Sequence, residues 1–227
     1  DDGFRDDSLR IIEKTQKFNS NCQVLFFSAT LNDIVKNFVT RIVAKEHNEI
    51  FVKKEELPLK AVKQYKVHCP DELAKIECKN VAKALVDLSY KVNSILDALE
   101  HEERDKMVKE FKDGSTGVLI SNDVLARGFD QDQVNLVINY DLPLNYTAEI
   151  TCGGKPELDC EVYFHRVGRA GRFGRKGAVF NLICDERDEK LMSKIENHFG
   201  NHVTEVRQKC VEDYKDAFKK AGLLYRC

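Results

Sequence analysis

Short apolar runs alternate with amphipathic segments along the chain, and the two patterns predict different elements. Continuous apolar runs are typical of strands buried in a parallel sheet, whereas apolar residues that recur every three or four positions are typical of helices. The predicted strands lie at 22–27, 50–52, 63–69, 90–95, 117–121, 134–139 and 178–184. The predicted helices lie at 4–18, 31–43, 71–86, 100–112, from 158 into the glycine-rich stretch that follows, and at 185–198. This alternation predicts an α/β fold with a parallel sheet.

A charged stretch at 44–62 separates the first helices from the rest of the chain and contains Pro58. Charge and proline without a hydrophobic period are typical of a connector between domains. We therefore expect an N-terminal piece at 1–52, a linker at 53–62 and a larger domain at 63–227. Within the larger domain, the stretch at 143–156 is predicted to be an irregular insert, because it lacks a period and contains adjacent glycines.

The most concentrated positive charge lies at 165–177, a stretch that contains no acidic residue. Its arginines recur at every third position, with glycines between them, and they are Arg166, Arg169, Arg172 and Arg175. In a helical or nearly helical segment this spacing sends several guanidinium groups toward one side, and glycine lets a phosphate approach the backbone. We interpret the stretch as a site for a polyphosphate or a nucleic acid rather than as a solvated basic loop.

Two further candidate sites follow predicted buried strands directly. The stretch at 121–130 contains two carboxylates and Arg127, and in it Gly128 frees the backbone to approach a ligand, while Asp130 can accept hydrogen bonds from a ribose. The triplet Ser28-Ala29-Thr30 stands between the strand predicted at 22–27 and the next helix. Ligands of open α/β sheets bind at the carboxyl ends of the strands. For the stretch at 121–130 alone, a structural arginine–aspartate pair is the competing interpretation.

Composition restricts the partners of this chain. Its formal net charge is -2, so a nucleic-acid footprint has to be local. No apolar run approaches the length of a membrane span, and we expect no membrane insertion. The eight cysteines form no CxxC pair, so we expect reduced thiols and no metal site.

Three motifs in this order resemble those of DEAD-box ATP-dependent RNA helicases of superfamily 2. Ser28-Ala29-Thr30 is similar to the family's SAT element, 122–130 to its TDxxARGxD element and 165–174 to its HRxGRxGRxG element. The resemblance runs over nearly the whole chain. Around 153–163 it is most similar to the plant form of the family's nuclear-pore mRNA-export helicase. It implies the tail of a first RecA-like domain at 1–52 and a second RecA-like domain, the helicase C-terminal domain, after the linker.

The resemblance also implies a role for each residue on the ATP side. Arg169 and Arg172 would reach the γ-phosphate, with Arg172 the best candidate for an arginine finger. Planar guanidinium donors suit charge that is spread over phosphoryl oxygens, which agrees with this assignment. His165 would help to link the ATP site to the RNA side, and Asp130 would contact the ribose. ATP and Mg²⁺ are the implied cofactors of the intact family.

On the RNA side, the resemblance implies contacts from Asn122, Arg127 and Gly128. Ser28, Ala29 and Thr30 would couple ATP hydrolysis to strand separation. Such helicases grip single-stranded RNA by its sugar-phosphate chain, so we expect little sequence specificity. The implied setting is mRNA export in nucleus and cytoplasm, with nuclear-pore or export proteins as further partners, and we expect a monomer.

The chain also departs from the family pattern. It contains no GxxxxGK[ST] sequence and no DEAD motif, so we expect no ATP hydrolysis by this chain alone. After Glu77, Cys78-Lys79-Asn80 is followed directly by residues that resemble the middle of a later helix of the family. This resemblance implies that one family strand is lacking near 78–80. Asn122 stands where the family has threonine, so its reach toward an RNA phosphate differs.

Three alternatives to the helicase half remain at this stage. One is a non-catalytic module that binds RNA or protein, derived from such a helicase. Another is a DNA helicase of the same superfamily, to which the motifs at 28–30 and 165–177 are less similar. The last is an α/β domain whose basic stretch only pairs with acidic neighbours.

Overall fold

The computed structural model describes residues 4–28, 33–43, 46–51, 62–70, 91–95, 99–123, 131–146, 156–207 and 210–223. The chain divides into two compact units, Asp1–Phe51 and Val52–Cys227. The predicted linker at 53–62 lies outside the described residues except for Val62, and so does the predicted helix at 71–86. No helix in the described ranges is long and apolar enough to cross a membrane.

The described part of the first unit contains two helices, α1 (Phe4–Phe18) and α2 (Asp33–Ile42), where helical periodicity predicted them. The strand predicted at 22–27 is wrong, because this segment belongs to no sheet among the described residues. Leu25 is 69% exposed and Phe27 is 88% exposed. The short strand predicted at 50–52 is also not formed at Ile50 and Phe51. An apolar run becomes a strand only when neighbouring strands take up its backbone hydrogen bonds, and the described part of this unit offers none.

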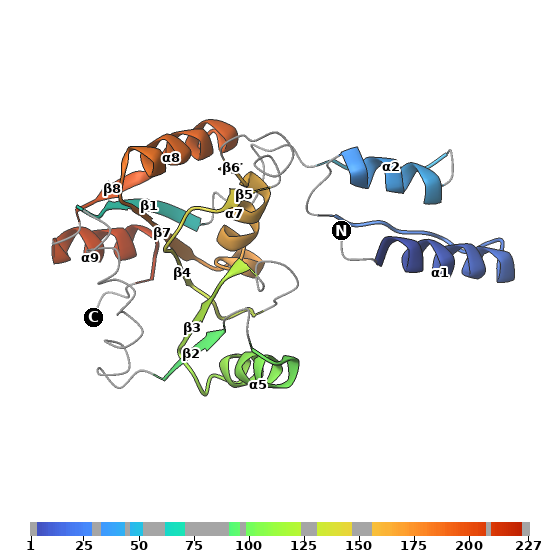
Figure 1. The fold of residues 1–227 in the computed structure, drawn as a ribbon, viewed down its shortest axis with the longest axis horizontal. Coiled ribbons are helices and arrows are strands. Elements are labelled where there is room, and N and C mark those ends of the chain that lie inside the picture. The colour runs from blue at the N-terminus through green and yellow to red at the C-terminus, as the bar shows by residue number, and fades with distance from the viewer. Residues whose placement is uncertain are drawn as a thin grey trace. The chain divides into compact units, whose positions relative to one another are not determined.

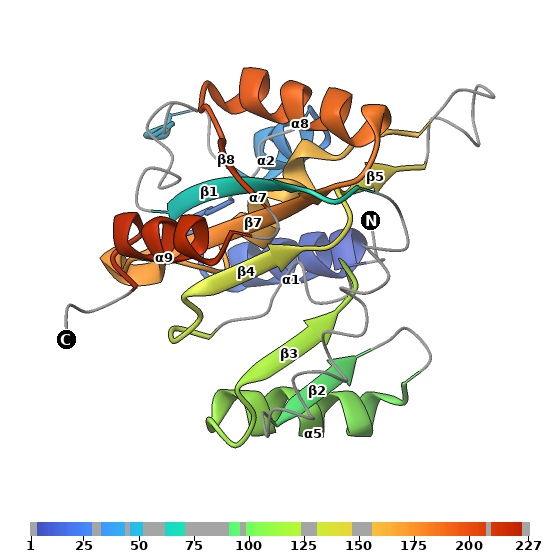
Figure 2. The same ribbon diagram turned by 90° about the vertical axis from the view of Figure 1, so that its left-hand side faces the viewer.

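A four-stranded parallel sheet forms the centre of the second unit (Figures 1 and 2). Its order is β4 (Leu136–Asn139), β7 (Gly177–Ile183), β1 (Val62–His68) and β8 (Thr204–Val206). All of its neighbouring strands run parallel. Every residue of β7 is buried, as its continuous apolar sequence predicts for a central strand. The parallel α/β fold class is therefore confirmed.

Helices cover both faces of this sheet (Figure 2). On one face, α7 (Cys160–Val167) and α8 (Glu186–Phe199) pack against Val179 and Ile183 of β7. On the other face, α9 (Val211–Lys220) packs against Phe180 and its neighbours. Successive residues of β7 point to opposite faces, so one strand supplies both cores.

A buried polar ladder crosses the sheet at its middle. Asn181 of β7 is 0% exposed, and its Nδ2 donates to the carbonyl of Tyr65 at 3.0 Å. Asn139 of β4 donates through Nδ2 to Asn181 Oδ1 at 2.8 Å. These bonds satisfy the two buried amide side chains and fix the register of three strands, because unsatisfied buried polar groups are costly.

The remaining described strands form two smaller sheets. β2 (Val92–Ile95) and β3 (Val118–Ser121) pair with each other in parallel, next to α5 (His101–Lys112). They do not join the four-stranded sheet. β5 (Leu144–Asn145) and β6 (Glu157–Leu158) form a short antiparallel pair at the two ends of the stretch predicted to be irregular.

Candidate functional site

The basic stretch follows a short helix whose ends are well defined. Asp159 is the N-cap of α7, and its Oδ1 accepts a hydrogen bond from the backbone nitrogen of Val162 at 2.9 Å. Tyr163 and Val167, one helical turn apart, are both 0% exposed. Tyr163 donates its hydroxyl hydrogen to Gln64 Oε1 of β1 at 2.7 Å, and its burial raises its pKa. The buried face of α7 thus fixes the position of the residues on its other face, His165 among them.

The arginines do not lie along one continuous helix, which differs from the geometry that their spacing predicts. α7 ends at Gly168, Gly171 has a left-handed φ of 71°, and a short 3₁₀ turn follows at Arg172–Gly174. Phe173 within this turn also has a positive φ, 55°. Glycine adopts the left-handed conformation without a steric penalty, so Gly171 allows the chain to turn here instead of continuing as a helix. The guanidinium groups consequently serve two different purposes.

Arg166 and Arg175 connect the basic stretch to other segments. Arg166 donates from Nε to Asp123 Oδ1 at 2.7 Å and from Nη1 to the carbonyl of Asp141 at 2.6 Å. Arg175 donates from Nη1 to the carbonyl of Asp132 at 3.1 Å. Because Asp123 follows β3 and Asp141 follows β4, Arg166 ties together the carboxyl ends of strands that belong to different sheets.

Arg169 and Arg172 are held against their own turn instead. Arg169 donates from Nε to the carbonyl of His165 at 2.9 Å, and Arg172 donates from Nε to the carbonyl of Gly168 at 3.0 Å. Both bonds reach back four residues, so the two side chains are anchored in the same way. This anchoring gives two half-buried guanidinium groups on neighbouring turns, which is a suitable arrangement for a multiply charged anion.

The other predicted site residues are placed as follows. His165 Nε2 lies 3.9 Å from Glu161 Oε1, one turn earlier on α7. Asn122 directly precedes Asp123, so the bond from Arg166 fixes the backbone that carries it. Ser28 lies in the first unit. Ala29, Thr30, Arg127, Gly128 and Asp130 lie outside the described residues.

Arg166 connects the two candidate stretches, a role that the sequence interpretation did not separate from those of the other arginines. The stretch at 165–177 contains no acidic residue, so several of its arginines were expected to face one side, toward a ligand. The structure supplies a carboxylate from Asp123, 43 positions earlier. The available signal was the aspartate directly after a predicted strand in the other candidate stretch.

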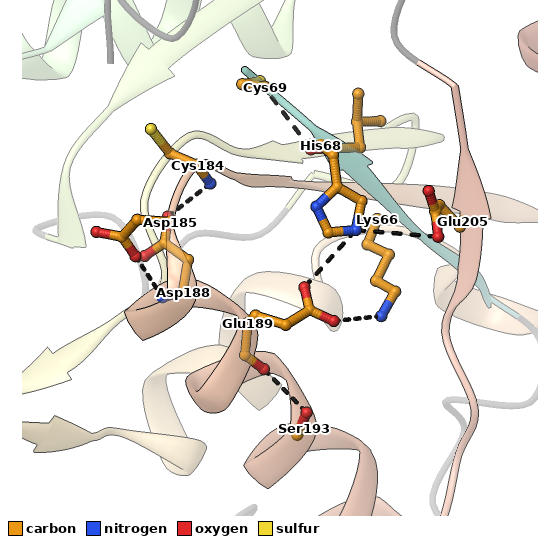
Figure 3. A network of polar contacts seen from close by, with 10 residues as sticks. Lys66, His68, Cys69, Cys184, Asp185, Asp188, Glu189, Ser193 and Glu205 are labelled. Carbon is orange, nitrogen blue, oxygen red and sulfur yellow. Dashed lines mark hydrogen bonds and ion pairs between the residues drawn. The ribbon is translucent and has the colours of Figure 1, made fainter. Parts of the chain in front are cut away.

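A separate polar cluster lies at the carboxyl end of β1 (Figure 3). Glu189 of α8 accepts from Lys66 Nζ at 2.9 Å, and its other oxygen lies 3.6 Å from His68 Nε2. Glu205 of β8 lies 3.9 Å from the same histidine nitrogen. The hydrogen bond that Lys66 donates to Glu189 raises the pKa of Lys66. The cluster joins α8, β1 and β8, and we assign it a structural role.

The close packing of Gly171 leads to a testable prediction. A Cβ at this position would lie 2.5 Å from Val62 Cγ2, whereas a Cβ at Gly174 meets nothing within 4 Å, and both glycines have φ above 70°. Gly171→Ala should lower the free energy of unfolding by about 2–4 kcal/mol, the sum of backbone strain and overpacking. Gly174→Ala, the matched control, should lower it by only about 1–2 kcal/mol. Urea denaturation followed by circular dichroism compares them, and equal losses would contradict the proposed contact with Val62.

Comparisons with known proteins find relatives along nearly the whole chain. The family model "Helicase conserved C-terminal domain" matches residues 68–174. DEAD-box ATP-dependent RNA helicase 38 of Oryza sativa subsp. japonica is 51% identical over 99% of this chain and 48% of that protein. Helicase 38 of Arabidopsis thaliana is 50% identical over 98% of the chain and 49% of the relative. The chain therefore spans about half the length of these curated relatives.

Solved structures show the same similarity. S. cerevisiae Dbp5 bound to RNA and ADP BeF3 has a TM-score of 0.77 and 28% identity, covering 99% of this chain and 60% of that one. The C-terminal domain of the DEAD-box protein Dbp5 has a TM-score of 0.60 and 29% identity, covering 71% of this chain and 99% of that one. The parallel α/β fold is that of the RecA-like helicase C-terminal domain. The chain is 51% and 50% identical to the two helicase 38 proteins along nearly its whole length. It therefore belongs to the DEAD-box RNA helicase family.

Proposed function

We propose that this chain provides one half of an ATP-dependent RNA helicase. This half contributes arginines to the ATP site and binds RNA. The observation that carries this proposal is the common anchoring of Arg169 and Arg172 beside a strand end that Arg166 fixes. Their positions match the family's HRxGRxGRxG element. In this role the chain, together with a P-loop-bearing partner half, unwinds or remodels RNA and RNA–protein complexes.

The proposed chemistry on the ATP side is electrostatic. Arg169 and Arg172 stabilise the charge that develops on the terminal phosphoryl group, and His165 at the end of α7 links them to the RNA side. The anchoring bonds from Nε to backbone carbonyls hold the guanidinium groups in place before ATP arrives. Such preorganisation lowers the barrier because little rearrangement is needed during the reaction. Asp130 would contact the ribose.

The proposed RNA contacts lie at the end of β3. Asn122, Arg127 and Gly128 would hold the sugar-phosphate chain, and Arg166 stabilises this edge through its bonds to Asp123 and Asp141. Residues 1–52 would be the tail of the first RecA-like domain, in which Ser28, Ala29 and Thr30 couple hydrolysis to strand separation. Backbone contacts of this kind carry little sequence information.

The residues of this chain do not fit a Mg²⁺ site. The sequence has no phosphate-cradling GxxxxGK[ST] and no DEAD motif, and the described residues contain no cluster of three metal-ligating side chains. The paired arginines, by contrast, suit the phosphate groups of ATP. We therefore assign this chain a share of the ATP site and derive no step through the metal ion.

This assignment predicts that the purified chain has no measurable RNA-stimulated ATPase activity. An arginine finger without a phosphate cradle has no bound substrate to act on. A phosphate-release assay with and without single-stranded RNA tests this prediction, with the Arg172→Ala variant in parallel to expose a contaminating enzyme. RNA-stimulated turnover that Arg172→Ala abolishes would contradict the proposal.

A non-catalytic binding module is the second candidate, and one comparison favours it. The C-terminal domain of S. cerevisiae Dbp5 L327V has been solved bound to Gle1 H337R and IP6, so that domain alone binds a protein partner. RNA affinity without ATP turnover would support a module, and the slope of affinity against salt would count its phosphate contacts. By analogy with these relatives, we propose a place in mRNA export, in nucleus and cytoplasm.

A further inference from the structure

Arg166 joins two parts of the second unit that no strand pairing connects within the described ranges. There, β3 pairs with β2 and not with the four-stranded sheet. Arg166 lies on α7, which packs against the four-stranded sheet, and its Nε donates to Asp123 Oδ1 at 2.7 Å, just beyond the end of β3. Its Nη1 donates to the carbonyl of Asp141, just beyond β4, at 2.6 Å. One side chain therefore holds the ends of β3 and β4 together.

The pair between Arg166 and Asp123 is partly shielded from water. The side chain of Arg166 is 21% exposed and that of Asp123 is 50% exposed. A second contact joins Arg166 Nη2 to the same Asp123 oxygen at 2.6 Å. Charge-assisted hydrogen bonds are stronger than neutral ones, and salt screens a partly buried pair less than an exposed one. The pair can therefore fix the backbone at Asp123 relative to α7.

The backbone of Arg166 also holds Arg169. The backbone nitrogen of Arg169 donates to the carbonyl of Arg166 at 3.1 Å, and Arg169 Nε donates to the carbonyl of His165 at 2.9 Å. Tyr163 and Val167 are 0% exposed and keep another face of α7 in the core. Because a packed core resists deformation, a restraint on the Arg166 side chain is passed on to Arg169 rather than absorbed by α7.

The other end of the connection lies at the proposed RNA contact. Asn122, for which we propose a contact with the sugar-phosphate chain, directly precedes Asp123. RNA held at Asn122 would therefore restrain the same piece of backbone that Asp123 attaches to α7. Two contacts that restrain one segment favour each other, and such coupling between sites is reciprocal.

We propose that Arg166 is a positioning residue that couples RNA held at the end of β3 to Arg169, which faces the phosphate groups of ATP. The connection runs from Asn122 through the pair of Asp123 and Arg166 to α7. RNA restrains Asp123, Asp123 restrains Arg166, and Arg166 keeps Arg169 in its anchored position. This coupling rests on the proposed function and adds to it a physical route by which RNA stimulates ATP hydrolysis.

The RNA affinity of the full chain tests the first step, by fluorescence anisotropy with a labelled single-stranded oligouridine. Asp123→Ala should weaken RNA binding by about tenfold, because the end of β3 loses its attachment to α7. Electrostatics alone predicts the opposite sign, since removal of a half-exposed carboxylate near an RNA phosphate should tighten binding. Asp123→Asn keeps an acceptor oxygen for Arg166 and should recover most of the affinity. Unchanged or tighter binding by Asp123→Ala would overturn the proposal.

Arg207 and Asp213 supply the matched control. Arg207 donates from Nε to Asp213 Oδ2 at 2.7 Å and from Nη2 to Asp213 Oδ1 at 2.9 Å, which ties the end of β8 to α9. Asp213→Ala should therefore change RNA affinity by less than about twofold. Thermal melts followed by circular dichroism check that each variant is folded.

A double-mutant cycle shows whether Arg166 and Asp123 act as one unit. Arg166→Ala combined with Asp123→Ala should bind RNA no more weakly than Arg166→Ala alone, because either change already breaks the connection. Losses of affinity that add up in the double variant would contradict the coupling.

ATP turnover tests the second step, in the chain fused behind the part of the rice helicase 38 that it does not match. Asp123→Ala should lower turnover at saturating RNA by about tenfold, and turnover without RNA by less than about threefold, because the connection acts when RNA is bound. Equal losses with and without RNA would overturn the coupling and leave Asp123 a structural role.

Arg172→Ala, assayed in parallel, separates this coupling from the proposed function. It should lower turnover both with and without RNA, because Arg172 acts on the phosphate groups themselves. A fusion without RNA-stimulated turnover, or one that Arg172→Ala leaves unaffected, would contradict the proposed function. The RNA affinities of the Asp123 variants would still decide the first step of the coupling.

Discussion

Arg172→Ala should reduce ATP turnover by about 10³-fold or more once this chain is joined to a half that binds ATP, in line with the contribution of arginine fingers to phosphoryl transfer. The partner half is the part of the rice helicase 38 that this chain does not match, which the family pattern predicts to carry the P-loop. Fused in front of the chain, it should restore RNA-stimulated ATP hydrolysis. We expect the large effect of Arg172→Ala because the Nε bond of Arg172 to the carbonyl of Gly168 holds its guanidinium group in place.

The control for this experiment is Arg175→Ala. Arg175 belongs to the same basic stretch, but it donates to the carbonyl of Asp132 and serves as a structural connection. Its loss should lower turnover by less than about tenfold, because no developing charge depends on it. Arg172→Lys separates charge from geometry, since lysine keeps the charge and lacks the planar fork. Turnover that falls equally in the Arg172 and Arg175 variants would contradict the division of the arginines into two classes.

Sequence alone predicted the helices and strands that have a clear hydrophobic pattern within their own residues. β7 was predicted because a strand buried on both faces is a continuous apolar run, and α8 because its apolar residues follow the helical period. β8 was missed, since three residues give no measurable alternation. α9 also went unpredicted, although its buried Ala217 packs against the sheet.

The segment at 22–27 shows why an apolar run is not sufficient evidence for a strand. It is an apolar run like β7, but β7 pairs with a strand on each side, whereas residues 22–27 belong to no sheet among the described residues. Strand formation is a property of the pair, because isolated extended backbone leaves its hydrogen-bonding groups to water.

The candidate site was predicted in composition but not in geometry. The spacing of the arginines drew attention to 165–177, yet it indicated one common face. α7 ends before Gly168, Gly171 turns the chain, and a contact over 43 positions joins Arg166 to Asp123. Neither effect is visible in a local period, because one depends on backbone conformation and the other on tertiary structure.

Tyr163→Ala should lower the free energy of unfolding by about 3–5 kcal/mol, the range for truncating a large buried aromatic side chain. Tyr163 is 0% exposed, its ring lies 6.0 Å from that of Phe199, and its hydroxyl donates to Gln64. A domain is typically stable by about 5–15 kcal/mol, so this loss is a large fraction of the total. Because Tyr163 holds α7 against the sheet, the change should also disturb His165 and the turn that follows.

Tyr163→Phe separates the ring from its hydroxyl group. The ring and its packing remain, and only the hydrogen bond to Gln64 Oε1, 2.7 Å long, is lost. That loss should cost about 1 kcal/mol, because Gln64 is only partly buried and water can replace the donor. Urea denaturation of both variants measures the difference. If alanine and phenylalanine destabilise the protein equally, the hydroxyl bond rather than ring packing positions α7, and the arginines that follow it depend on Gln64.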